Sequence, residues 1–419
     1  MKKYLFLLGL PLIFCERIDA QTYDTNNPVV QTFVGSGFYG HYDGQGTQTM
    51  FYQPSSIVAD SSGNFFVGDN ANYRIRKITP SGAVTTFVGG GNSSVPGYGT
   101  NVSLHNYSFN GMAIDRSNVL WVAVSYQSSL LRIAPDGLVQ PIILAGVSSP
   151  GGICVDSKNN VYVSDLSSHK IYRLLTNGVF EVFAGSGNPG AIDGNGVFNS
   201  FNGPSALAVD AADNIYVWDA YNYRLRKISQ NRDVTTIAGK INISANQDGV
   251  GTNAMFGGVL GMAFDATGNL ILSSAVSSYS SSGSAIRRLA ADGTVTTIAG
   301  SFSETGYING IGEEARFSGA SGICISQGNL FVADSANHRI RTISFGSAAQ
   351  PVPGGNLVLN VYPGLKITGN IGRNYRIESS TNMSNWISEG TIVLNHSPYL
   401  WIDENGIASN KFYRAFLLP

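Results

Sequence analysis

The sequence is poor in the residues that build covalent or metal-bound frameworks. It contains three cysteines and five histidines in 419 residues. Cys154 and Cys324 occupy equivalent places in a repeat described below, in units that would lie opposite one another in a ring of six, too far apart for a disulfide. We therefore expect both to be small buried thiols, and the composition argues against a disulfide-stabilised scaffold.

Charged side chains are also scarce. Asp, Glu, Lys and Arg make up 13% of the chain, and the net charge is -1. No cluster of Lys and Arg is present, so the sequence carries no electrostatic footprint for nucleic acid or for an anionic membrane surface. With 43% hydrophobic residues, the chain is able to bury a large core.

Long apolar runs are confined to the start of the chain. Lys2 and Lys3 precede an apolar stretch that ends at Cys15, and Ala20 supplies a small residue for cleavage. This pattern predicts a signal peptide over residues 1–20. No later segment is long and apolar enough to span a bilayer. We expect a secreted protein, whether extracellular, periplasmic or held at the cell surface.

What the sequence has in abundance is repetition. A unit with four short apolar runs recurs six times between Val30 and Ser344. The fullest copy comprises Ala208–Asp210, Asn214–Asp219, Tyr223–Ile228 and Val234–Gly239. Self-similarity at roughly 40 to 60 residues, with short strands and Gly- or Asn-bearing turns, is typical of a β-propeller. We predict an all-β fold with six four-stranded blades over residues 29–344.

The sixth unit ends at Ile343 without a fourth strand. A copy of that strand stands alone near the start of the chain, at Val30–Val34. We predict that this N-terminal segment completes the last blade, because closing the ring removes the unpaired edges that an open array would expose.

Three turns carry a family resemblance. Ala333–Arg341 reads ADSANHRIR, Asp69–Ile75 reads DNANYRI and Asp219–Leu225 reads DAYNYRL. These segments resemble the NHL repeat, which is named for its Asn-His-Leu core. The second and fifth units depart from the pattern, because Ser125–Ser129 and Ser273–Ala285 lack the Asp and the Asn.

The repeat gives way to a different pattern after a linker at residues 345–356, which contains Pro and Gly. Runs such as Tyr375–Thr381 and Phe412–Leu417 predict four to six short strands over residues 357–419. This module resembles a small β-sandwich seen at the C-termini of exported bacterial proteins. We expect Trp386 and Trp401 to be core aromatics rather than sugar-stacking platforms.

The central channel is the place where an enzyme of this shape would hold a metal, because six-bladed gluconolactonase-like and amidating-lyase-like relatives do so. The positions expected at one channel mouth are Ser55, Asn110, Gly151, Ser205, Leu260 and Ser321. They include no carboxylate and no imidazole, the groups that divalent cations prefer. Ser55, Asn110, Ser205 and Ser321 are therefore candidates for a weak polar site, and no metal or other cofactor is predicted.

Recurring acidic residues favour structural roles over catalysis. Four of them recur in blades that radiate apart: Asp69, Asp165, Asp219 and Asp334. We expect each to cap its turn or to form an exposed pair with a nearby arginine, such as Arg74, Arg224 or Arg339. In the Gly-rich linkers, Asp43, Asp193 and Asp248 leave Ca²⁺ open as a weaker alternative. His169 and His338 share a column with Tyr73 and Tyr223 and are assigned structural or surface roles.

The leading hypothesis for function is a non-catalytic binding scaffold. Propeller loops form wide, rigid platforms, and tyrosine is a favoured interface residue. The candidate binding residues on the loops between blades are Tyr39, Tyr42, Tyr98, Tyr107 and Tyr307. The expected partner is a protein or a glycan, and the expected state is a monomer. The alternatives are a metal-dependent lactonase or lyase with its site in the channel, and a purely structural envelope component.

Overall fold

The computed structural model describes residues 23–105, 107–124, 129–276, 283–347, 364–367, 374–380, 385, 387–393, 399–402 and 412–417. The predicted signal peptide, most of the predicted linker and Trp386 lie outside these residues. The chain divides into two compact units, Met1–Ala348 and Ala349–Pro419.

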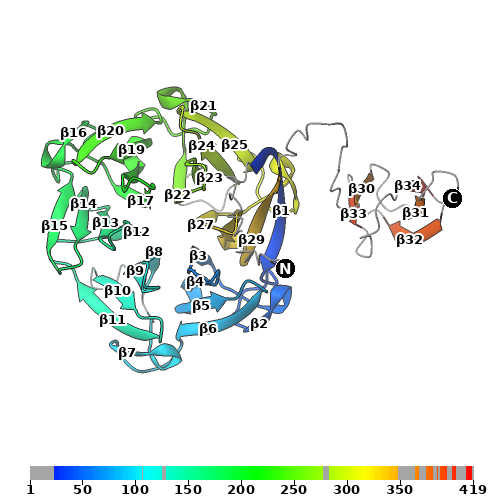
Figure 1. Cartoon of the computed structure of the whole chain (residues 1–419), viewed down its shortest axis with the longest axis horizontal. Helices are drawn as coiled ribbons and strands as arrows, with labels where there is room; N and C mark the ends of the chain where they lie inside the picture. Colours follow the sequence, from blue (N-terminus) through cyan, green and yellow to red (C-terminus); the bar gives the residue numbers. More distant parts are fainter. Residues whose placement is uncertain are drawn as a thin grey trace, which may run out of the picture. The chain divides into compact units, whose positions relative to one another are not determined.

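The first unit is a six-bladed β-propeller, as predicted (Figure 1). Blade 1 contains β2 (Gly44–Gln45), β3 (Pro54–Ala59), β4 (Phe65–Asp69), β5 (Arg74–Ile78) and β6 (Ala83–Gly89). Blade 2 contains β7 (Gly97–Tyr98), β8 (Phe109–Ile114), β9 (Leu120–Val124), β10 (Ser129–Ile133) and β11 (Leu138–Ile143). Blade 3 contains β12 (Pro150–Val155), β13 (Val161–Asp165), β14 (Lys170–Leu174) and β15 (Phe180–Ala184).

The remaining blades repeat this plan. Blade 4 contains β16 (Gly194–Asn195), β17 (Pro204–Val209), β18 (Ile215–Asp219), β19 (Arg224–Ile228) and β20 (Asp233–Ala238). Blade 5 contains β21 (Gly249–Val250), β22 (Gly258–Phe264), β23 (Leu270–Ala275), β24 (Ser284–Leu289) and β25 (Thr294–Gly300). Blade 6 contains β1 (Tyr23–Val34), β26 (Gly310–Ile311), β27 (Ala320–Ser326), β28 (Asn329–Asp334) and β29 (Arg339–Ser347).

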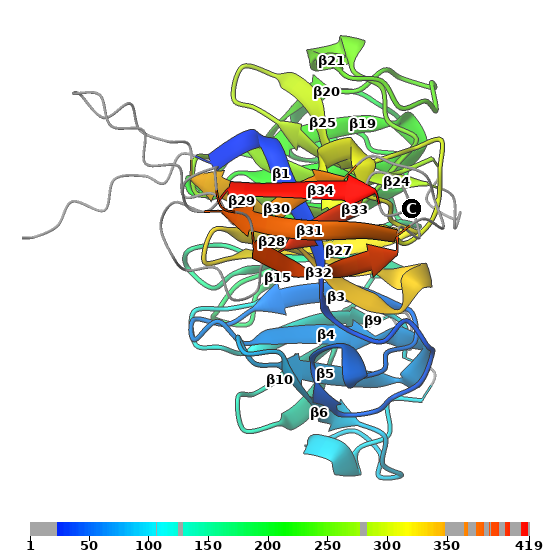
Figure 2. The ribbon, with the colours of Figure 1, turned by 90° about the vertical axis from the view of Figure 1, so that its right-hand side faces the viewer.

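Each blade is an antiparallel sheet. In blades 1 to 5 the four long strands follow one another in chain order from the centre outward, as β3 to β6 do in Figure 2. The prediction of four strands per blade omitted one element. In every blade except the third, the described residues form a two-residue outer strand, so those sheets contain five strands.

The ring closes through β1, as predicted from the orphan strand. In blade 6, β1 pairs antiparallel with β29, with Val30 opposite Ile343. Val30 and Val34 are fully buried. The strand is longer than predicted, because it begins at Tyr23 and continues through a register shift between Asp24 and Val29.

The six inner strands contact one another around the centre, and β27 contacts β3 to complete the circle. This close approach depends on glycine. A Cβ atom on Gly152 would lie 2.2 Å from the carbonyl oxygen of Ser205 in the next blade, and one on Gly322 would lie 2.6 Å from Cα of Ser56. Glycine at these places lets neighbouring backbones come together where the propeller is narrowest.

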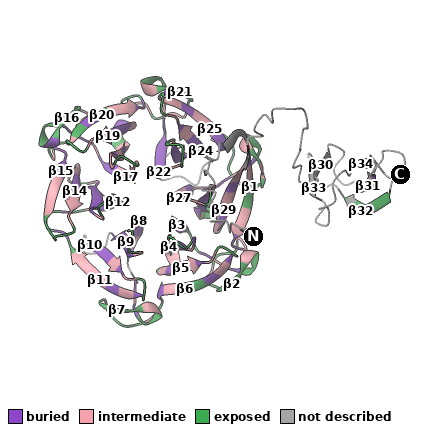
Figure 3. Cartoon of the chain, viewed as in Figure 1, coloured by how far each residue is buried: buried purple, intermediate pink, exposed green. Residues whose placement is uncertain are grey.

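Buried residues of neighbouring blades pack against one another, as Phe66 of blade 1 and Met112 of blade 2 do. Exposed residues gather in the outer turns (Figure 3). Cys154 and Cys324 are free, buried thiols, as expected. Burial raises the pKa of both thiols, and the charge of Asp156 adds to this effect for Cys154.

The antiparallel order gives the propeller two faces. We call the side with the first turn of each blade, such as Asp60–Asn64, the turn face. The opposite side, the loop face, carries the linkers between blades and the second turns. Several second turns are short 3₁₀ helices, namely η2 (Asn70–Asn72), η6 (Ala220–Asn222) and η9 (Ser335–Asn337). Similar helices follow the outer strands, namely η1 (Gly46–Gln48), η3 (Gly99–Asn101), η5 (Gly196–Phe198), η7 (Gly251–Asn253) and η8 (Gly312–Glu314).

The second unit contains short strands, as predicted. These are β30 (Gly364–Ile367), β31 (Asn374–Ser380), β32 (Ile387–Val393), β33 (Tyr399–Ile402) and β34 (Phe412–Leu417). β30 pairs with β33, and β31 lies between β32 and β34. Tyr375 and Ile377 of β31 are buried.

Candidate functional site

The polar residues predicted at the channel mouth lie on the inner strands and connect neighbouring blades. Ser55 Oγ donates a hydrogen bond to the Phe109 carbonyl (3.0 Å), and Asn110 Nδ2 donates to the Pro150 carbonyl (2.8 Å). Ser321 Oγ donates to the Ser55 carbonyl (2.8 Å). At Ser205 the carbonyl accepts a hydrogen bond from Ser164 Oγ (2.6 Å). These contacts join one blade to the next, and a role in ligand binding remains a prediction.

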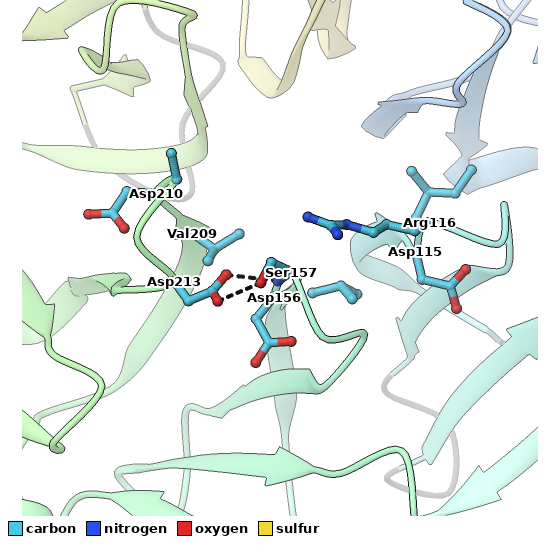
Figure 4. Close-up of a pocket in the computed structure, with 10 residues that line it drawn as sticks. Asp115, Arg116, Asp156, Ser157, Val209, Asp210 and Asp213 are labelled. Carbon is cyan, nitrogen blue, oxygen red and sulfur yellow. Dashed lines mark hydrogen bonds between the residues drawn. The ribbon is translucent and has the colours of Figure 1, made fainter.

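A pocket of about 310 Å³ opens at the other channel mouth, on the turn face (Figure 4). It spans the first turns of blades 2, 3 and 4. Its polar lining includes Arg116, Ser157 and Asp213. Sequence reasoning missed this pocket because its residues come from three different repeats. Arg116 and Asp213 also differ from the Ser61 and Asn118 that hold the equivalent places elsewhere.

The other acidic residues of the pocket are engaged by their own turns. Asp115, Asp156 and Asp210 each accept backbone N–H groups from the residues two and four positions later, at 2.8–3.0 Å. These Asx-type bonds fix the turn that joins the first two strands of a blade. The carboxylates therefore shape the pocket wall through the backbone.

Asp213 differs because it reaches across to the preceding blade. Its carboxylate accepts the Ser157 N–H (2.8 Å) and the Ser157 hydroxyl (2.7 Å). Slight burial acts to raise the pKa of Asp213, but the hydrogen bonds from Ser157 and the charges of Lys158 and Arg116 outweigh it and lower the pKa. A carboxylate with a lowered pKa is a weak general base. The pocket thus combines an ionised carboxylate and a guanidinium suited to binding a small polar ligand.

Three of the recurring aspartates form buried ion pairs, which corrects the prediction of exposed pairs. Asp69 pairs with Arg76, Asp219 with Arg226 and Asp334 with Arg341, each at 2.8 Å and with both side chains fully buried. The predicted partners Arg74, Arg224 and Arg339 were wrong by two residues. Burial raises the pKa of Asp219, whereas the Asn202 N–H, Asn222 and Arg226 act in the opposite direction.

Asp165 has a different set of partners in blade 3. It accepts hydrogen bonds from the backbone N–H groups of Ser148 (2.8 Å) and Ser149 (3.0 Å) and from the Ser168 hydroxyl (2.7 Å). The residue equivalent to Arg76 is Tyr172, whose hydroxyl donates to the Gly146 carbonyl. Asp165 therefore caps its turn, which is the first of the two roles predicted for these aspartates.

The linker aspartates also contact buried arginines, two of which, Arg76 and Arg226, belong to the pairs described above. Asp43, Asp193 and Asp248 accept hydrogen bonds from Arg76, Arg226 and Arg287 at 2.5, 2.6 and 2.8 Å. Each also accepts a backbone N–H from the outermost long strand, from Thr86, Thr236 and Thr297 respectively. A Ca²⁺ ion bound by these carboxylates would have to displace a guanidinium group. Among the described residues, no group of three or more His, Cys, Asp and Glu side chains is placed to hold a metal.

The two histidines of the Tyr/His column connect blades. His338 Nδ1 accepts the Gln53 N–H (3.2 Å), and His169 Nδ1 accepts the Gly203 N–H (3.0 Å). Gln53 (φ 53°) and Gly203 (φ 66°) share a left-handed conformation that directs the N–H to the ring. Burial lowers the pKa of His338, and the charge of Arg339 acts in the same direction.

Aromatic residues cluster on the loop face where blade 6 meets blade 1. We define the seam patch as Phe38, Tyr39, Tyr52 and His338. The Tyr39 ring centroid lies 5.4 Å from that of Tyr52, which lies 5.5 Å from His338. Phe38 and Tyr39 are 73% and 72% exposed. The patch therefore presents apolar ring surface, and the Tyr39 ring packs against Tyr52 and His338.

The predicted binding tyrosines separate into two groups. Tyr39, Tyr42, Tyr98 and Tyr307 are exposed, but Tyr107 is buried and packs in the core between blades 1 and 2. Tyr307 also supports the seam, because Arg339 lies 3.6 Å from its ring centroid and its hydroxyl is 2.8 Å from Thr32 Oγ1. Only Tyr39 of the five belongs to the seam patch.

In the described part of the chain, no helix is long and apolar enough to span a membrane.

Comparison with known proteins identifies NHL repeats. The family model described as "NHL repeat" matches residues 51–78 and 317–343, which cover the first three strands of blades 1 and 6. The chain is 29% identical over 252 residues to NHL repeat-containing protein 2 of Bos taurus, across 55% of this chain and 34% of that protein. It thus spans about a third of that relative's length.

Solved structures share the propeller. A structural genomics protein of unknown function from Bacteroides thetaiotaomicron aligns with a TM-score of 0.61 and 20% identity over 76% of each chain. An auxiliary nutrient binding protein from the same organism aligns with a TM-score of 0.60 and 15% identity, also over 76% of each chain. At these identities the likeness concerns the fold alone. The chain is a six-bladed propeller that contains NHL repeats.

Proposed function

We propose that the protein is an exported, monomeric, non-catalytic binding propeller that uses the seam patch to contact a protein or glycan partner. The observation that supports this proposal is the exposure of Phe38 and of Tyr39, whose ring packs against Tyr52. Exposed, supported aromatic rings are the residues that contribute most to protein interfaces, and their faces also suit stacking on sugar rings.

The bonding partners of the recurring polar residues support this proposal. The recurring carboxylates bond to arginines or to their own turns, and the column histidines bond to neighbouring backbone. These groups stabilise the blades. The exposed loops are therefore the surface on which we place the residues that recognise a partner.

The test is a glycan array and a pull-down from the source medium with the purified chain, followed by affinity measurement for any ligand found. Replacing Phe38 and Tyr39 by serine should weaken binding about tenfold or more, since hot-spot aromatics each contribute on the order of 2 kcal/mol. Phe198→Ser is the matched control, because Phe198 is 83% exposed on the rim of blade 4. Equal weakening by the control and the seam variant would contradict the proposal.

The second candidate is a metal-dependent lactonase or lyase acting in the channel, whose substrate would bind in the turn-face pocket. That function requires a stoichiometric metal in the purified protein and activity that EDTA abolishes. The scaffold proposal expects unchanged ligand binding and an unchanged melting temperature in EDTA. A fall of several degrees in EDTA, together with lactone or amide turnover, would favour the enzyme.

A further inference from the structure

Blade 3 has an outer edge unlike the edges of the other blades. In blades 1, 2, 4, 5 and 6 a two-residue strand pairs with the outermost long strand, but within the described residues β15 of blade 3 has no such partner. The difference arises from the linker. β11 ends at Ile143 and β12 begins at Pro150, whereas the corresponding connection in blade 1 runs from Val34 to Pro54. The short connection has no room for an outer strand.

The five outer strands share one sequence pattern, Gly-x-Gly. They are Gly44–Gly46, Gly97–Gly99, Gly194–Gly196, Gly249–Gly251 and Gly310–Gly312. The second glycine is always left-handed, with φ between 51° and 57°. In blades 1, 2, 4 and 5 its N–H donates a 2.9 Å hydrogen bond to a carbonyl of the turn that precedes the outermost long strand, for example Gly46 to Gly82. In five blades of this chain, the edge of the outermost long strand therefore binds a Gly-x-Gly segment.

The outer strand covers an apolar position that remains partly exposed in blade 3. Val84, Val139, Val234 and Val295 each pair with or lie under the outer strand and are at most 1% exposed. Phe180 occupies this position in β15 and is only partly buried, and the preceding Val179 is 48% exposed. The far end of β15 contacts η5 as in other blades. The bare part is thus the stretch from Gly178 to Val182.

β15 also lacks the features by which natural edges avoid pairing. It contains no proline and no lysine, the residues that commonly protect exposed strands. Its one charged residue, Glu181, is neutralised by Arg173 and Arg232. In blade 1 the Thr86 N–H points outward to Asp43, and Val182 holds the equivalent place in β15, since Val182 pairs with Tyr172 as Thr86 pairs with Arg76.

We propose that the outer edge of β15 binds an extended Gly-x-Gly segment of a partner protein by β-augmentation. The register of the other blades places the first glycine opposite Phe180 and the middle residue opposite Val179. The second glycine then turns left-handed and donates its N–H to the Gly178 carbonyl. Main-chain hydrogen bonds supply the affinity of such a contact, and the requirement for a left-handed glycine supplies its specificity. This surface lies apart from the seam patch and goes beyond the function proposed above.

The probe for this site is a fluorescent peptide that copies residues 191–200, the outer segment of blade 4. Fluorescence anisotropy should detect saturable binding to the full-length protein. Replacing the second glycine of the peptide by valine should weaken binding about tenfold or more, because valine does not tolerate the left-handed conformation. N-methylation of that residue, which removes the N–H, should have the same effect.

Variants of β15 complete the test. Val182→Pro removes an outward N–H while remaining compatible with an edge strand, and it should abolish the peptide signal. Val182→Thr keeps the N–H and should bind like the original chain. If Val182→Pro does not fold, the peptide variants still test the proposal, because they are measured on the original chain. Equal affinity for all peptides would overturn the proposal, as would dimerisation through β15 in sedimentation experiments, which would identify a second copy as the occupant.

Discussion

Arg76, Arg226 and Arg341 are among the largest fully buried side chains of the propeller. Each pairs with a buried aspartate and packs against the face of a buried phenylalanine, namely Phe51, Phe201 and Phe317. Blade 2 replaces both members of the pair, with Val124 and Leu131 in the equivalent places. Blade 2 thereby loses both buried charges, since one buried charge without its partner is costly. Blade 5 keeps a buried arginine, Arg287, which pairs with the linker residue Asp248 instead. Blade 3 keeps Asp165, which accepts hydrogen bonds from backbone N–H groups and Ser168.

The coupling between these two charges is measurable at Asp219 and Arg226. We expect Arg226→Leu to lower the free energy of unfolding by about 3–5 kcal/mol, because it leaves the buried Asp219 carboxylate without its cation. Asp219→Asn keeps an acceptor for the Asn202 N–H. Combined with Arg226→Leu, it should cost clearly less than the sum of the single changes in urea unfolding. Additive costs would show that the pair is not coupled.

His338 makes the stability of the seam depend on pH. Its pKa is lowered in the fold, so the unfolded chain binds the proton more readily. Stability from this residue is therefore present above the unfolded pKa of about 6.5 and is lost as the pH falls towards the folded pKa. His338→Tyr, which copies Tyr73 and Tyr223, should flatten this part of the curve of unfolding free energy against pH. A curve identical to that of the original chain would assign the pH dependence elsewhere.

The long strands could be predicted from the sequence, and the two-residue outer strands could not. Short apolar runs at regular spacing, bounded by turns such as Asp210–Asn214, predicted the inner four strands of the blades because the same pattern recurs six times. The outer strands were missed, since two residues such as Gly44 and Gln45 have no apolar pattern of their own. They depend on tertiary pairing with β6.

The candidate site was less accessible to prediction for a related reason. Sequence columns identify residue types that recur, but Arg116 and Asp213 each stand in one turn only. They approach Ser157 only because blades 2, 3 and 4 converge at the channel. The unpaired outer edge of β15, in contrast, could have been predicted from the sequence. The linker before blade 3 is short and has no Gly-x-Gly, although Gly-x-Gly precedes the other blades.

Closure of the ring by β1 ties the stability of all six blades to one strand. Removing residues 23–34 should lower the free energy of unfolding by roughly 3–6 kcal/mol from Val30 and Val34 alone, at about 1.5–3 kcal/mol for each buried side chain. It would also expose the edge of β29. Differential scanning calorimetry of the shortened chain measures the loss.

The matched control for this deletion is truncation after Ala348, which removes the second compact unit and keeps the first. The melting transition of the propeller should persist in that truncated chain. If removal of residues 23–34 left the transition unchanged, the ring would not depend on β1.

The pairing of Val30 with Ile343 also orders events during biosynthesis. The segment that is made first finds its partner only after the last blade has left the ribosome. Until then β1 has no strand of its own blade to pair with, and the ring cannot close. The ring is therefore complete only when the two ends of the propeller segment, made more than three hundred residues apart, have met.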